Sequence, residues 1–452
     1  MLGRAETGRI LTETLAQGTG RMTEALLVAK DVCVTRFANS VIHQNVAERT
    51  VDLTVRIIDG HRVGIATTSD LSRQGLARAT ARARRLVQTI SGNGAAVPLP
   101  PVQPAEALND RDPRTAAATP EARAEAVGRM CALAGRQGAV AAGAFITAEF
   151  EVAVANSLGT MAYHVSTLAD LHTVMTRGEG SGYASAVAMA VSQIDPEAVA
   201  AEAIEKAVRG RDPQPIEPGE YEVVLEEPAV AEMLKYFGQY AFSATGVVQG
   251  TSFMSGRFGE PVLSDRVTIW DDGLDPQGLR QPFDFEGVPK QKVRLVDGGV
   301  AAGVVHDTAS AAREQTASTG HALPPTFTYL RGPYPLNMFM AGGAATRDEM
   351  VRSIKRGIWV SRFHYTAVVD PKRLVLTGLT RDGTFLIEDG RLAKPLRNLR
   401  FAQDCVAALG DVDMVGRTTK VERTKLFRDF FNVSEVPALK IRRFAFTGLA
   451  GA

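Results

Sequence analysis

The sequence predicts an α+β protein of more than one domain. Apolar residues alternate with period two in some segments and recur at helical spacing in others, without the regular strand and helix alternation of a doubly wound sheet. The chain has 452 residues, which suggests two or three domains rather than one ordinary core. Prolines and charges interrupt both periodicities over 210–220, so we expect domains over 1–215 and 216–452.

The first domain is predicted to mix strands and helices. Asp59-Gly60 is a tight-turn signal between two strand segments, and apolar residues recur on one face of a helix over 70–90. Glycine, proline and alanine dominate 92–120, which predicts a long surface loop. The remaining helices are expected over 8–17, 121–136 and 195–208, and the strands over 25–30, 32–37, 40–47, 51–59, 62–68, 144–156, 161–175 and 183–191.

The second domain is predicted to consist mainly of strands and turns. It begins with a strand over 221–225 and a helix from Pro228 to about Ser243. Hairpin-like turns follow at 296–299 and 388–391, and a further helix is expected over 346–356.

Composition and charge argue against nucleic acid as a partner. Apolar residues make up 45% of the chain, and 51 basic side chains are balanced by 50 acidic ones. One basic stripe stands out on the helix over 70–90, and a solvated helix face is the favoured interpretation. This stripe consists of Arg73, Arg78, Arg82, Arg84 and Arg85.

Cysteine usage and hydropathy predict a soluble, cytoplasmic protein. Cys33, Cys131 and Cys405 are widely spaced and odd in number, which favours a reducing compartment over a disulfide framework. Charges within 1–20 argue against a secretory signal. The longest apolar runs fall well short of the roughly 20 residues that cross a bilayer, so no membrane association is expected.

Common catalytic motifs are missing from the sequence. None of the seven histidines is followed by glutamate, no two cysteines have zinc-ligand spacing, and neither a nucleophile elbow nor a phosphate-binding loop is present. The glycine-rich stretch 178–182 is predicted to be a flexible turn. His306, Asp307, His321 and His364 could converge as an unusual metal site, but separate histidines are the favoured interpretation. We therefore expect no cofactor.

Several motifs stand out along the chain. In the first half these are 36–40, the turn at Asp59-Gly60, 64–71 and the Asn156-Ser157-Leu158-Gly159 turn. The more specific ones are 253–259 (FMSGRFG), 271–273 (DDG), 282–289 (PFDFEGVP), 318–322 (STGHA), 356–360 (RGIWV) and 386–390 (LIEDG). In this order the motifs resemble the TldD/TldE family, also called PmbA or modulators of DNA gyrase, and the resemblance covers nearly the whole chain. It implies a C-terminal domain dominated by a curved, largely antiparallel sheet.

The resemblance also implies where a metal site would lie. In TldD subunits a helix before the SG motif carries HExxxH, and a cysteine in the C-terminal tail is a further ligand. Here Lys235 and Tyr240 stand at the histidine positions and Tyr236 at the general-base position. An ammonium group has no lone pair for a cation. After Gly416 the sequence contains neither cysteine nor histidine, so the tail ligand is missing as well.

These vacant ligand positions predict a TldE-like, non-catalytic subunit. The resemblance implies a heterodimer with a TldD-like catalytic subunit that cuts unstructured peptides in a shared cavity, although a homodimer stays open. Two alternatives remain. One is a stand-alone hydrolase with relocated ligands such as His306, His321 and His364, and the other is a regulatory binding protein linked to DNA gyrase.

Overall fold

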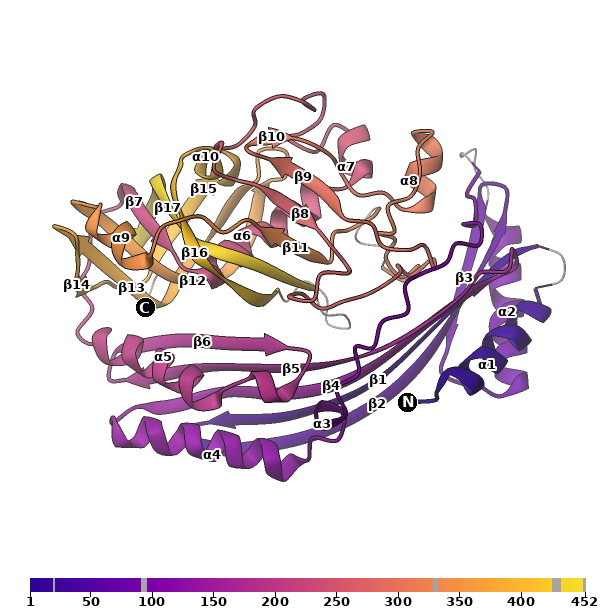
Figure 1. The fold of residues 1–452 in the computed structure, drawn as a ribbon, viewed down its shortest axis with the longest axis horizontal. Coiled ribbons are helices and arrows are strands. Elements are labelled where there is room, and N and C mark those ends of the chain that lie inside the picture. The colour runs from indigo at the N-terminus through magenta and orange to yellow at the C-terminus, as the bar shows by residue number, and fades with distance from the viewer. Residues whose placement is uncertain (19–20, 91–95, 328–331, 425–431, 450–452) are drawn as a thin grey trace.

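The computed structural model describes residues 1–18, 21–90, 96–327, 332–424 and 432–449, and these residues form two β-sheets. The first sheet uses strands that precede residue 189, and the second uses strands that follow residue 218. The first sheet lies beneath the second-sheet half of the molecule in Figure 1, with helices on its opposite side. The α+β class predicted from the sequence is confirmed.

The first sheet is antiparallel and very long in the strand direction. Its described strands follow the order β3-β2-β1-β4-β5-β6. They are β1 (Met22–Ala38), β2 (Val41–Asp59), β3 (Arg62–Thr68), β4 (Val140–Asn156), β5 (Met161–Arg177) and β6 (Gly180–Ala188).

Two predicted strand pairs are single strands, which corrects the sequence-based boundaries. The segments 25–30 and 32–37 form β1, and the segments 40–47 and 51–59 form β2. The predicted breaks fall on polar residues, yet Asp31 pairs with Arg49 of β2 and with Glu149 of β4. Backbone pairing therefore carries the strands through polar positions.

Helices cover one face of this sheet, and residues from the second half of the chain cover part of the other. Along β1, Ala25, Leu27 and Ala29 pack beneath helices, whereas Leu26 and Val28 pack against Phe283, Phe285 and Tyr334 of the second half. This two-sided burial explains the uninterrupted apolar run at the start of the strand. The helices are α1 (Arg4–Ala16), α2 (Arg73–Thr89), α4 (Pro120–Arg136) and α5 (Pro196–Arg209).

Two further predictions in the first half need correction. The expected loop over 92–120 contains α3 (Pro113–Ala116) and a bridge between Asp110 and Ser166 in its described part. The glycine-rich stretch 178–182 is not only a turn, since β6 begins at Gly180. Strand β6 lies so close to α5 that a Cβ atom at Gly182 would be 2.1 Å from the Ala203 carbonyl oxygen. Glycine is needed there for close packing of strand and helix.

The second sheet is largely antiparallel and partly closed. Its described strands are β7 (Gly219–Leu225), β8 (Ile269–Asp271), β9 (Val293–Asp297), β10 (Val300–Ala301), β11 (Asn337–Met340), β12 (Arg356–Asp370), β13 (Val375–Glu388), β14 (Arg391–Pro395), β15 (Leu399–Asp404), β16 (Val412–Thr424) and β17 (Asn432–Leu449). Only the β7–β12 and β11–β17 pairs are parallel among the described strands. Since β7 also pairs with β17, strands β7, β12, β13, β15 and β17 close a ring.

Short helices complete the second half. They are α6 (Glu227–Tyr240), α7 (Ala244–Val248), α8 (Thr308–Arg313), α9 (Arg347–Arg352) and α10 (Cys405–Gly410). The predicted helix from Pro228 ends at Tyr240, and the predicted helix over 346–356 ends at Arg352 because β12 begins at Arg356. Within the described residues, we find no helix with both the length and the apolar character that spanning a membrane requires.

Candidate functional site

Helix α6 carries the three residues that the sequence singled out. Pro228 occupies its first turn, and an apolar face that includes Val230, Leu234 and Phe237 is buried in the core of the second sheet. Gly238 packs tightly, since a Cβ atom there would lie 2.9 Å from the Met338 side chain. The helix is therefore held firmly, and it carries Lys235 and Tyr236, which are buried, and Tyr240, which is half-buried.

All three side chains are held in place by neighbours. The Lys235 Nζ lies 2.5 Å from the Glu232 carboxylate and 4.5 Å from the centre of the Tyr236 ring. The Tyr236 hydroxyl donates a 2.5 Å hydrogen bond to the backbone carbonyl of Thr366 on β12. Tyr240 is half-buried against the second core.

The chemistry of these groups does not suit a zinc ion. Burial raises the pKa of the Tyr236 phenol, with the Glu232 charge adding to the rise, and burial also raises the pKa of Tyr240. Both phenols therefore stay protonated at neutral pH, and Lys235 forms an ion pair with Glu232. An ammonium and two protonated phenols offer a divalent cation no anionic or imidazole donor.

A polar cavity of about 250 Å³ opens beside Lys235, between α6 and strands from both sheets. Three cations line it, and each one is paired with an acidic side chain. Lys235 pairs with Glu232, Arg362 pairs with Asp382, and Arg423 pairs with Asp170 at 2.5 Å. The cavity can therefore accept polar groups, but its own charges are largely balanced.

The rim of this cavity contains a strained aromatic residue. Tyr365 on β12 has φ near 50° and leaves 78% of its surface exposed. The β12–β13 register shifts between His364 and Ala367, so the residue sits in a bulge. Residues held in sparsely populated backbone conformations cluster at functional sites.

The structure does not bring the alternative metal ligands together. The His321 ring is buried between Asp271, at 2.7 Å, and Thr319, at 2.9 Å. Asp307 caps α8, and His364 lies on β12 beside Tyr365. The His306 carbonyl accepts backbone bonds from the His321 segment. Across the described ranges, no group of three or more histidine, cysteine or acidic residues has the arrangement of a metal site.

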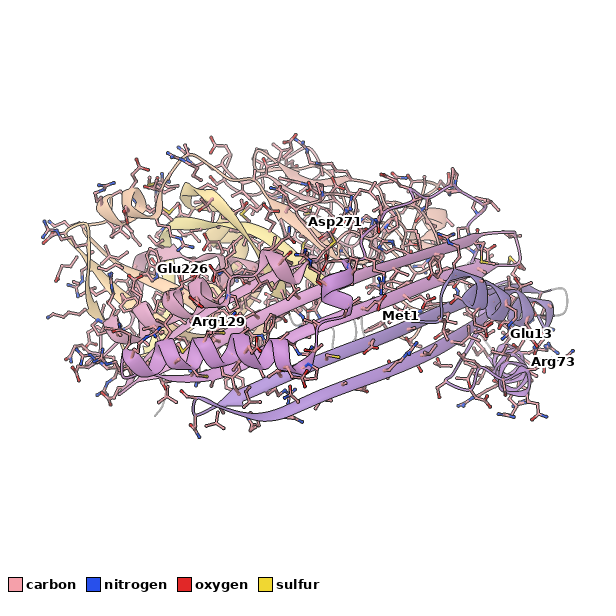
Figure 2. The ribbon with its side chains drawn as sticks, turned by 60° about the horizontal axis from the view of Figure 1, so that its bottom comes forward. Met1, Glu13, Arg73, Arg129, Glu226 and Asp271 are labelled. Carbon is pink, nitrogen blue, oxygen red and sulfur yellow. The ribbon has the colours of Figure 1, made fainter. Side chains whose placement is uncertain are left out.

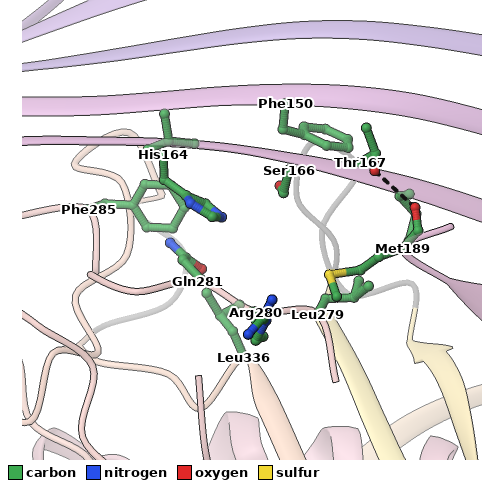
Figure 3. A pocket seen from close by; sticks show the side chains of 12 residues that line it. Phe150, His164, Ser166, Thr167, Met189, Leu279, Arg280, Gln281, Phe285 and Leu336 are labelled. Atoms are coloured by element: carbon green, nitrogen blue, oxygen red, sulfur yellow. Dashed lines mark hydrogen bonds between the residues drawn. The ribbon is translucent and has the colours of Figure 1, made fainter. Parts of the chain in front are cut away.

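A second cavity, of about 70 Å³, lies between the first sheet and the segment 279–285 (Figure 3). Phe150, His164 and Ser166 face it from the sheet, and Arg280 and Gln281 face it from the opposite side. Arg280 donates to the Asp110 carboxylate, which lies 3.4 Å from the His164 ring. Burial lowers the pKa of His164 to about 4, so the ring is neutral at physiological pH. This cavity contains none of the residues predicted from the sequence.

Charged residues that the sequence reasoning missed also join the two halves. Arg56 of β2 donates to Glu24 of β1 at 2.7 Å and to Glu286 at 2.8 Å. Burial raises the pKa of Glu24 to about 7 despite the Arg56 charge, and Glu286 contributes to the rise. Only Glu286 had a signal in the sequence, because it lies in the motif over 282–289. Glu232 was also missed, although its spacing of three residues from Lys235 predicts a helical ion pair.

The motif residues have structural roles. The Asp284 carboxylate accepts backbone hydrogen bonds from Glu286, Val288 and Ala322 at 2.8 to 2.9 Å. The Asn156 side chain accepts from the Leu158 and Thr160 amides. These bonds fix the turns at 156–160 and 284–288, and they tie the second turn to Ala322.

The fold and the cavities define a two-sheet α+β protein whose candidate site is a polar cavity beside α6.

Three family models match the chain. They are described as PmbA/TldA metallopeptidase domain 1, central domain and C-terminal domain, and they match residues 24–87, 99–211 and 218–448. The chain belongs to this PmbA/TldD family, which confirms the resemblance found in the sequence.

Solved structures share the fold over the full length. TldE from Thermococcus kodakarensis superposes with a TM-score of 0.88 at 19% identity and covers 98% of this chain and 100% of that one. A candidate modulator of a DNA gyrase from Thermotoga maritima gives a TM-score of 0.84 at 18% identity, covering 98% and 99%. At these identities the likeness establishes the fold alone.

Curated relatives match over shorter stretches. A TldD homolog of Haemophilus influenzae, described as a metalloprotease, is 26% identical over 174 residues, which cover 38% of this chain and 36% of that protein. A metalloprotease of Methanothermobacter thermautotrophicus is 26% identical over 216 residues, covering 47% and 46%. The chain thus spans less than half the length of these relatives.

Proposed function

We propose that this chain is a non-catalytic, TldE-like subunit of a TldD/TldE-type metallopeptidase. In this proposal a TldD-like chain supplies the metal and cuts unstructured peptides. The present chain supplies scaffold and part of the wall of a shared cavity. The alternative assembly is a homodimer of this chain.

The α6 contacts carry this proposal. Lys235, Tyr236 and Tyr240 take the positions that the family resemblance gives to two zinc ligands and a general base. Lys235 is committed to Glu232, and Tyr236 to the Thr366 carbonyl. A zinc site would need these groups to lose both their protons and their partners. We therefore interpret the three positions as a vestigial metal site.

A cytoplasmic location is part of the proposal. Cys33, Cys131 and Cys405 are all free thiols, which suits a reducing compartment. Balanced charge and the arginine contacts argue against nucleic acid. On α2, Arg78 pairs with Asp70 and Arg73 lies 3.6 Å from the Glu13 carboxylate (Figure 2), so the arginine stripe is partly neutralised within the chain.

Metal analysis combined with a peptidase assay tests the proposal. The purified chain, incubated with zinc and then dialysed, should retain no stoichiometric metal by mass spectrometry and should not cleave an unfolded polypeptide such as reduced casein. Adding a TldD-like chain that carries HExxxH should produce cleavage that a chelator abolishes.

Two matched controls locate the activity. A TldD-like chain whose HExxxH glutamate is replaced by glutamine should leave the mixture inactive, whereas Lys235→Ala in the present chain should leave the mixture's cleavage unchanged. Chelator-sensitive cleavage by the present chain alone would refute the proposal and favour the stand-alone hydrolase.

A further inference from the structure

The cavity of about 70 Å³ between the first sheet and the segment 279–285 combines apolar walls with a small polar group. In Figure 3 the Gln281 side chain lies between the His164 ring and the Arg280 guanidinium. Cavities with apolar walls and a few convergent polar groups are typical of small-molecule sites. The apolar side chains on the wall are Phe150, Val152, Leu168, Met189, Leu279, Phe285 and Leu336.

Three buried polar atoms on this wall have no hydrogen-bond partner among the described residues. They are His164 Nε2, Arg280 Nε and Gln281 Nε2. The His164 side chain is almost fully buried, with 6% of the residue exposed. A buried donor without an acceptor is costly, and folded proteins seldom leave several of them in one place. The three atoms therefore indicate that a polar group binds in the cavity.

The charges around these atoms are already balanced. The Arg280 guanidinium donates to the Asp110 carboxylate through Nη2, so its Nε–H stays available. The His164 ring is neutral, because burial lowers its pKa to about 4. Its Nε2 lies 3.4 Å from the Asp110 carboxylate without the geometry of a hydrogen bond. A bound carboxylate would bury a further charge beside a cation that is already paired, so a neutral ligand is favoured.

We propose that this cavity binds a primary carboxamide with a short aliphatic chain. The Gln281 side chain carries a donor and an acceptor next to each other, so it can pair with a second primary amide through two hydrogen bonds. The Arg280 Nε–H donates to the same ligand oxygen. In the tautomer that is protonated on Nδ1, the His164 Nε2 accepts the remaining amide hydrogen. Such a ligand would provide a partner for all three atoms.

The cavity volume limits the length of the ligand. A water-sized group needs roughly 10 to 15 Å³, so about five non-hydrogen atoms fit. Propionamide has this size, and so does a glutamine side chain beyond its Cα atom. The aliphatic part would contact apolar wall residues such as Leu168, Met189 and Leu279, from which ordered water would gain nothing. The same chemistry can thus come from a free amide or from a glutamine of a peptide. This inference goes beyond the proposed function, since binding requires neither a metal nor a TldD-like chain.

NMR of the methionine methyl groups tests the proposal on the isolated, full-length chain, because Met189 lines the cavity. Met189→Leu identifies its resonance. Propionamide should shift this resonance saturably, with a dissociation constant of about 1 to 10 mM for a ligand of this size. Propionate, which has the same shape and a negative charge, should cause no saturable shift.

A pair of variants separates the polar contact from general effects. Gln281→Met keeps the length of the side chain but removes its amide, and it should weaken propionamide binding at least tenfold. Gln277→Met, at an exposed position four residues earlier, is the matched control and should bind propionamide like the parent chain. The other methionine resonances report whether each variant is folded.

Two peptides distinguish the sources of the amide. They are acetyl-Ala-Gln-Ala-N-methylamide and the same peptide with glutamate in place of glutamine. A shift with propionamide alone supports a site for a free amide, whereas a shift with the glutamine peptide as well supports a site for a peptide side chain. Three results would overturn the proposal: no saturable shift with either amide, as when ordered water alone fills the cavity; propionate binding equal to that of propionamide; and unchanged affinity in Gln281→Met.

Discussion

Replacing Glu24 with glutamine should make the protein more stable at alkaline pH. Glu24 is 1% exposed, and it shares the Arg56 guanidinium with Glu286. One guanidinium facing two buried carboxylates leaves a negative charge without compensation. Burial, opposed by Arg56 and assisted by Glu286, therefore raises the pKa of Glu24 from 4.5 to about 7.

The sign and size of the effect follow from proton linkage. Because the pKa of Glu24 is higher in the folded chain, the folded chain binds more protons between pH 4.5 and about 7. The free energy of unfolding therefore falls as pH rises through this window. Each pKa unit corresponds to about 1.36 kcal/mol, so about 3 kcal/mol of stability is lost by pH 8. Glutamine cannot ionise, and Glu24→Gln should avoid this loss.

Urea denaturation followed by circular dichroism measures the difference. Glu24→Gln should match the parent within about 1 kcal/mol at pH 5 and exceed its stability by about 3 kcal/mol at pH 8. Glu125→Gln, an exposed position on α4, is the control and should change neither value. If Glu24→Gln destabilises the chain equally at both pH values, Glu24 is ionised and well paired, and the reasoning is wrong.

Three further predictions concern single contacts, and urea denaturation at pH 7.5 measures each of them. Asp284→Ala should destabilise the chain by about 3 kcal/mol, because three buried backbone amides lose their acceptor; a loss under about 1 kcal/mol would contradict this role. Tyr236→Phe should cost about 1 kcal/mol by leaving the Thr366 carbonyl without its donor, and an unchanged stability would show that this hydrogen bond contributes little. Gly182→Ala should destabilise by about 2 kcal/mol because of the clash with α5, whereas Gly128→Ala, with nothing within 4 Å on α4, should stabilise by about 1 kcal/mol; equal effects of the two would argue against the clash.

Local patterns predicted the elements whose stability comes from near neighbours. The strand expected over 62–68 matches β3, and the helix expected over 70–90 matches α2 at Arg73–Thr89. The continuity of β1 and β2 was not predictable in the same way. Polar residues interrupt their periodicity, and pairing with strands distant in sequence holds them extended.

The candidate site was likewise predictable only in part from the sequence. Periodicity predicted a helix from Pro228, and the family resemblance singled out Lys235, Tyr236 and Tyr240 on it, none of which is an imidazole or thiolate donor. The partners could not be predicted, since Thr366 is 130 residues from Tyr236, and Asp170 is 253 residues from Arg423. No local period relates residues at such separations.

The sequence by itself therefore determined the family, the α+β class and the chemical identity of the groups on α6, because these depend on residue type and short-range order. Only the tertiary structure decided which charges are buried together, as at Glu24, Arg56 and Glu286, and which polar groups line the cavity beside the segment 279–285. Burial and pairing depend on neighbours that folding brings together from distant parts of the chain, so composition and periodicity do not reveal them.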